Sequence, residues 1–168
     1  SFAGVELGGI SALAVLDGGA RALALSDAGT WFELALGYDA QGALNAATLV
    51  RSAQVPDALG RGPETKRAGD SEALALLPDG GFAIAYEQQH RIMRFAASHP
   101  AFARPPVQLA MPEGLARAPA NGGIEALAAL KDGRLVALTE RLSAPQALTG
   151  GAPGRWRQGC WCCGRSRR

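Results

Sequence analysis

Two segments of the chain repeat almost the same pattern. Residues 72–87 read E-A-L-A-L-L-P-D-G-G-F-A-I-A-Y-E and residues 125–140 read E-A-L-A-A-L-K-D-G-R-L-V-A-L-T-E, so both fit E-A-L-A-x-L-x-D-G-x6-E. A looser third copy covers residues 11–27, with one extra residue at its turn. Three alanines take the same place in the copies: Ala12, Ala73 and Ala126. A period of about 50 residues is typical of stacked units such as propeller blades, because one such unit cannot bury its own hydrophobic face.

Each copy predicts a β-hairpin. Apolar runs at 72–77 and 82–87 flank Pro78-Asp79-Gly80-Gly81, and Asp-Gly is a strong hairpin signal since both residues tolerate positive φ. Alanine and leucine also favour helices. Runs this short, bounded by turn residues, nevertheless favour strands.

Further strands are expected after the first two hairpins, at residues 30–36 and 90–95, with a looser fourth strand in each unit. Residues 51–69 are polar and rich in proline and glycine, which predicts a long surface loop, and residues 107–110 are a short strand candidate. The predicted fold is therefore all-β: a partial β-propeller of two to three blades, each a four-stranded antiparallel sheet, from a longer protein.

Composition limits the partners of this body. Of the 17 basic residues, five are arginines in residues 150–168, which leaves 12 basic against 15 acidic residues and a net charge of −3. An acidic body argues against nucleic acid as a partner. No apolar run is long enough for a membrane span. The first residue is Ser1 and no signal peptide is apparent, so we expect a mature form or a fragment.

The last 19 residues differ from the rest. They contain no acid, no periodicity and all three cysteines, Cys160, Cys162 and Cys163. We expect the propeller domain at residues 1–149 and a basic tail at residues 150–168 that is disordered or comes from a shifted reading frame. A metal or redox role for C-x-C-C has little support, since no histidine or fourth cysteine lies nearby.

Acids occupy the open end of each predicted hairpin. Turns centred on the two Asp-Gly pairs predict that Glu72 faces Glu87 and Glu125 faces Glu140, and the longer turn of the first copy, centred on Gly19, predicts that Ser11 faces Asp27. Facing carboxylates destabilise a strand pair, so their repetition suggests a cation, a basic partner or a shared proton. In a propeller these acids, with Asp70, would form a ring near the channel mouth. The alternative is that they cap solvent-exposed strand ends. We call the candidate metal ligands the acidic set: Asp27, Asp70, Glu72, Glu87, Glu125 and Glu140.

A histidine and an arginine follow one of these acids. His90 and Arg91 could hold a phosphate or carboxylate, or His90 could transfer a proton. The alternative is an exposed loop. Lys66 and Arg67 are further candidate anion ligands, or solvated loop residues. No serine lies in a nucleophile-elbow motif, so serine hydrolase chemistry has weak support.

Several segments resemble one known family. They are G-G-I-S-A-L-A, L-S-D-A-G-T-W-F, K-R-A-G-D-S-E-A-L-A-L-L-P-D-G-G, Y-E-Q-Q-H-R-I and N-G-G-I-E-A-L-A-A-L-K-D-G-R-L-V-A-L-T-E. Over residues 8 to about 142 the chain resembles the phytase-like β-propeller domain family, often labelled "esterase-like activity of phytase". Asp70-Ser71-Glu72-Ala73-Leu74 corresponds to the family's Asp-x-Glu-Gly-Leu, with alanine in place of glycine. Glu87, His90 and Arg91 match its Glu-x-x-His-Arg.

The resemblance implies an exported protein, periplasmic or secreted, that hydrolyses phosphate or carboxylate esters of small molecules. We expect calcium within the acidic set, with His90 and Arg91 as catalytic residues that meet the substrate anion. The alternatives are a non-enzymatic propeller that binds a ligand or protein, and an inactive gene fragment. Open blade faces predict self-association.

Overall fold

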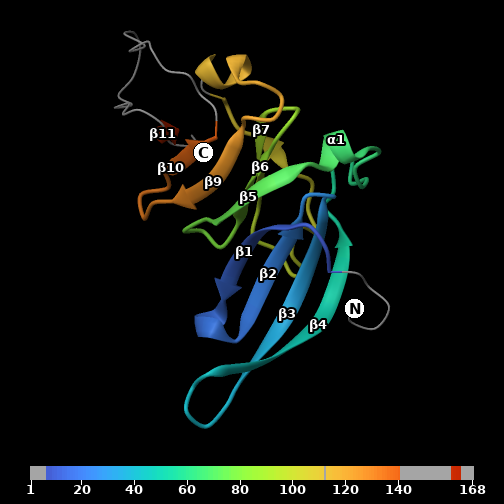
Figure 1. Ribbon diagram of the computed structural model, residues 1–168, viewed down its shortest axis with the longest axis vertical. Helices are drawn as coiled ribbons and strands as arrows, with labels where there is room; N and C mark the ends of the chain where they lie inside the picture. The colour runs from blue at the N-terminus through green and yellow to red at the C-terminus, as the bar shows by residue number, and fades with distance from the viewer. Residues whose placement is uncertain (1–6, 112, 141–159, 164–168) are drawn as a thin grey trace.

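The computed structural model describes residues 7–111, 113–140 and 160–163. They form three antiparallel sheets, each made of consecutive strands (Figure 1). The first sheet contains β1 (Ile10–Leu16), β2 (Arg21–Ser26), β3 (Thr30–Tyr38) and β4 (Leu44–Gln54). The second contains β5 (Ser71–Leu76), β6 (Phe82–Tyr86), β7 (Arg91–Phe95) and β8 (Val107–Gln108). The third contains β9 (Ile124–Ala129), β10 (Leu135–Thr139) and β11 (Cys160–Cys163).

Short helical turns join these strands. They are η1 (Asp17–Gly19), α1 (Lys66–Gly69) and η2 (Glu113–Arg117). No helix in the described part of the chain is long and apolar enough to cross a membrane. Within the predicted tail, Cys160–Cys163 are described and pair as β11 with β10; the rest of residues 150–168 lies outside the described residues.

The sheets are arranged like successive propeller blades. The first strand of each sheet is innermost, because β5 contacts both β1 and β9 (Figure 1). The predicted fold class, an all-β partial propeller, is confirmed.

Two hydrophobic cores lie between the sheets. The side chains of β6 alternate: Phe82, Ile84 and Tyr86 pack towards the first sheet, while Ala83 and Ala85 pack towards the third. This is the two-residue period of a strand buried on both faces. The second sheet is therefore fixed from both sides, which gives its strand ends a rigid support.

The hairpin turns differ from the prediction by one residue. Leu74 pairs with Ile84 and Leu127 with Ala137, so the loops contain three residues rather than two. Gly80 and Gly133 have φ of +79° and +82°. Asp79 and Asp132 do not share this conformation; each accepts a hydrogen bond from the backbone N–H two residues later instead. A three-residue loop that ends in a left-handed glycine explains the shift.

The predicted surface loop, residues 51–69, is longer at both ends than the loop in the structure. β4 stays paired with β3 as far as Gln54, which faces Thr30. At the other end, the Thr65 side chain accepts a hydrogen bond from the Ala68 N–H and caps α1. The connection without regular structure is therefore residues 55–65.

Candidate functional site

The three hairpins close in the same way at their open ends. The residue after the second strand donates its N–H to a carbonyl just before the first strand: Asp27 to Gly9 at 2.8 Å, Glu87 to Asp70 at 2.8 Å, and Glu140 to Gly123 at 3.1 Å. The sequence repeat is thus a structural repeat. It brings an acid to the same place in each sheet, at the inner end of the blade.

A β-bulge follows in every sheet. The register shifts at Ser11, Glu72 and Glu125, so none of the three has a partner in the ladder. The predicted facing pairs are therefore wrong, because the three-residue turn moves the register and the bulge removes the first acid from it. The bulge redirects this side chain at the sheet end, as bulges do near functional sites.

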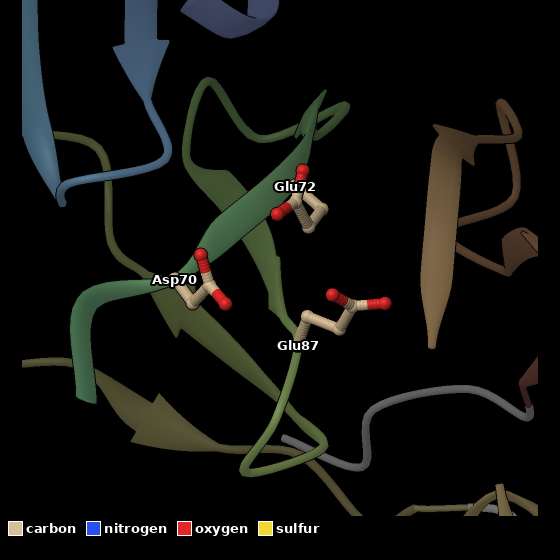
Figure 2. Close-up of side chains that lie close together, drawn as sticks. All are labelled: Asp70, Glu72 and Glu87. Carbon is tan, nitrogen blue, oxygen red and sulfur yellow. The ribbon is translucent and has the colours of Figure 1, made fainter. Parts of the chain in front are cut away.

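Five members of the acidic set nevertheless come together. One oxygen from each of Asp70, Glu72 and Glu87 lies within 4.8 Å of the others, and the same holds for Glu87, Glu125 and Glu140. Figure 2 shows the first group converging from the start of β5 and the segment after β6. Glu87 belongs to both groups, so the acids of the second and third sheets form one continuous cluster.

The charges in this cluster oppose one another. Burial raises the pKa of Glu72 to about 7, and the neighbouring carboxylates, Asp70 foremost, add to the rise. Burial and the nearby Glu87 and Glu140 also raise the pKa of Glu125. Excess negative charge at one place is what a bound cation would relieve.

Backbone and amide groups hold two of the carboxylates in place. Gln88 donates its side-chain N–H to Asp70 Oδ2 at 2.6 Å, and the Gly123 N–H donates to Glu87 Oε1 at 3.1 Å. Gln88 has a φ of +54°, unusual for a non-glycine residue. The sequence gives no sign of this backbone conformation or of these two hydrogen bonds. We therefore did not predict Gln88 or Gly123 as site residues.

Asp27 belongs to neither acidic group, although its charge is among those that raise the pKa of Glu72. Its Oδ2 lies 3.0 Å from Lys66 Nζ. Within the first sheet the bulge residue is Ser11 rather than a glutamate. The first sheet thus contributes an ion pair where the second and third contribute carboxylates.

His90 lies beside the cluster. Its Nε2 is 3.0 Å from the Pro119 carbonyl, in a solvent-exposed contact, so Nε2 carries the proton and donates. Its Nδ1 is buried without a hydrogen-bond partner. A Cβ added to Gly123 would lie 2.8 Å from Nδ1 and 3.1 Å from Glu87 Cγ. Only a glycine at position 123 lets the His90 imidazole and Glu87 pack this closely. Of the two ring nitrogens, Nε2 is the one that a ligand could reach.

Arg91 lies elsewhere. Its guanidinium donates to the Gln89 carbonyl at 3.0 Å and to the Ala68 carbonyl, and stacks over the Tyr86 ring at 4.0 Å. It lines a pocket to which no member of the acidic set contributes. His90 and Arg91 are adjacent in the sequence but lie at different places in the structure: His90 beside the acidic cluster and Arg91 in the pocket.

Three propeller-like sheets with acids gathered at the inner strand ends define a β-propeller-type protein with an acidic face. A family model described as "Phytase-like: Esterase-like activity of phytase" matches residues 5–157, and the chain belongs to this phytase-like family. Its members commonly depend on calcium and are typically extracellular. The comparison with curated proteins found no match. The family match ends within the predicted tail and includes the whole acidic set.

Proposed function

We propose that the acidic cluster binds calcium and supports hydrolysis of a phosphate or carboxylate ester of a small molecule. The observation that carries the proposal is the cluster itself. Its five carboxylates come from two neighbouring sheets and form two groups of three, with Glu87 in both. Membership of the phytase-like family agrees with it. Fold and family alone do not fix a substrate.

The donor set fits calcium. Every candidate ligand is a carboxylate, and hard divalent cations with flexible coordination prefer oxygen ligands. Asp70, Glu72 and Glu87 would hold one ion, and Glu87, Glu125 and Glu140 offer a second arrangement. Calcium in this position would supply Lewis-acid chemistry by polarising an ester oxygen.

The residues of the chain supply orientation and proton control. Without a cation Glu72 has a pKa of about 7, whereas a calcium ion bound to it would keep this carboxylate ionised, as a ligand. His90 Nε2 could exchange the Pro119 carbonyl for a substrate oxygen. The proposed catalytic residue of the chain is thus His90, beside the carboxylates that would hold calcium.

A non-enzymatic propeller is the second candidate. It is favoured by the surroundings of His90, since Nε2 contacts the Pro119 carbonyl and Nδ1 is buried. In that case the cluster would bind a cation that bridges a ligand, with no turnover.

One experiment separates the two candidates. Turnover of an aryl phosphate and an aryl ester is measured with calcium and with a chelator, in the wild-type chain, in Glu72→Gln and in Glu64→Gln. Glu64 is an exposed acid in the 55–65 connection and serves as the control. Hydrolysis that requires calcium and is lost only in Glu72→Gln supports the enzyme; calcium binding without turnover supports the binding protein.

Calcium binding is tested independently by thermal unfolding. At a concentration 100-fold above its dissociation constant, calcium should stabilise the fold by about 2.7 kcal/mol. The absence of a shift, or the same shift in Glu72→Gln/Glu125→Gln, would exclude the cluster as the site. For the location we propose the periplasm or the exterior of the cell, on the strength of the family. Cell fractionation tests this.

A further inference from the structure

A pocket of about 450 Å³ lies between the first and second sheets, beside the 55–65 connection. It is lined by that connection, by Tyr86 at the end of β6 and by Arg91 at the start of β7. The acidic cluster takes no part in its walls. The pocket is therefore a second place where a ligand could bind.

Two arginines line this pocket, and they differ in their partners. Asp57 and Glu64 also line the pocket, and both pair with the exposed Arg61, at 3.1 Å and 3.6 Å. Arg91 is half-buried, and no carboxylate within the described residues pairs with it. Its contacts are the carbonyls of Ala68 and Gln89 and the ring of Tyr86. No other hydrogen-bond partner of the guanidinium lies among the described residues.

A half-buried cation without a counter-ion is costly. Removing a charge from water carries a desolvation penalty that neutral carbonyls offset only in part. Burial accordingly lowers the pKa of Arg91, although a guanidinium remains charged at any physiological pH. An anion in the pocket would supply the missing counter-charge, and the planar guanidinium suits two oxygens of one oxyanion.

Tyr86 adds a second donor beside it. The residue is 5% exposed and lines the same pocket. Burial raises its pKa to about 12, so the hydroxyl keeps its proton and can donate to an acceptor in the pocket. The Arg91 guanidinium stacks on the same ring, which holds the two donors together.

We propose that this pocket is an anion site, in which Arg91 and Tyr86 bind the phosphate monoester or carboxylate group of a small molecule. Binding here needs neither calcium nor hydrolysis, because none of the acidic set lines the pocket. The site therefore stands whether or not the chain is an enzyme.

Isothermal titration of the full chain in chelator tests the site, with inorganic phosphate, phenyl phosphate and benzoate as probes. Wild type should bind at least one probe, and Arg91→Gln should bind it at least about tenfold more weakly, since a charge-assisted hydrogen bond is lost. Arg51→Gln is the control, because Arg51 is an exposed arginine that does not line the pocket, and it should bind like wild type. Failure of wild type to bind any probe, or equal binding by Arg91→Gln, overturns the proposal.

A second measurement does not need the Arg91→Gln variant, so it tests the site even if that variant fails to fold. Phenylglyoxal modifies accessible arginines, and peptide mapping reports each site separately. The bound probe should protect Arg91 in wild type but leave the exposed Arg51, outside the pocket, reactive. Equal protection of both arginines, or of neither, contradicts the site. Glu72→Gln should leave the protection unchanged, which separates this site from the acidic cluster.

Discussion

At the scale of single residues, the site depends on side chains that are neither acidic nor repeated. Gln88 holds Asp70, and Gly123 leaves room for both Glu87 and His90. Gln88 also has a positive φ, a cost that surrounding contacts must offset and that often accompanies functional sites. The cluster is therefore held in place by its neighbours, although the charges within it repel.

The pKa of Glu72 makes stability fall as pH rises. Below about pH 4.5 the carboxyl is protonated in folded and unfolded chains alike. Between this pH and about 7 the unfolded chain loses its proton first, so the free energy of unfolding decreases until both states are ionised. Glu72→Gln removes this effect. In chelator, its melting temperature should match wild type near pH 4 and exceed it at pH 8.

Glu64→Gln is the control for this series, because Glu64 is exposed and belongs to neither acidic group. A Glu72→Gln variant that differs from wild type equally at pH 4 and pH 8 would contradict the raised pKa.

Gly123→Ala tests the packing around Glu87. The added methyl group would lie 2.8 Å from His90 Nδ1, so the histidine or Glu87 must move. We expect a loss of about 1–3 kcal/mol in the free energy of unfolding, the usual cost of overpacking, together with weaker calcium binding. Gly8→Ala is the control, because a Cβ there meets nothing within 4 Å. Chemical denaturation measures both variants, and equal stabilities would contradict the packing described.

At the scale of elements, the sequence predicts the hairpins but not their register. The apolar runs and the Asp-Gly turns correctly indicate the strands of the second and third sheets. Whether the loop holds two residues or three depends on the side-chain bonds of Asp79 and Asp132, which strand periodicity does not encode. The bulges at Glu72 and Glu125 are equally invisible. The acids were thus identified by the repeat, while their mutual geometry was predicted wrongly.

The turn glycines should affect stability alone. Gly133 has a φ of +82° and no neighbour within 4 Å of an added Cβ, so Gly133→Val would add backbone strain without a clash. We expect a loss of about 1 kcal/mol or more, measured by denaturant unfolding. The calcium affinity of the folded protein should be unchanged, because the turn is at the far end of the hairpin. A weaker affinity at unchanged stability would refute this division of roles.

At the scale of the whole molecule, the sequence predicts the sheet order but not the tertiary contacts of the connecting segments. Phe102 falls in a proline-rich stretch without periodicity, yet its ring packs against Trp31, Phe82 and Phe95. The 55–65 connection likewise forms a pocket wall. Such contacts depend on how the blades stack, which local pattern does not specify.

The outward face of the first sheet predicts self-association. Leu13 and Val15, two residues apart on β1, are 58% and 56% exposed, and exposed large apolar side chains favour interfaces. We expect sedimentation velocity to show a species larger than the monomer at high protein concentration. Leu13→Thr/Val15→Thr should shift the chain towards the monomer. A wild-type chain that stays monomeric and melts cooperatively would contradict this prediction.

The bulge shared by the three sheets has a consequence for how such a protein can diversify. A bulged residue is outside the strand ladder, so no cross-strand partner constrains its identity. The chain itself illustrates this freedom, with Ser11 in the first sheet and glutamates in the other two. One substitution per blade could therefore rewrite the chemistry of the inner face while the scaffold stays the same.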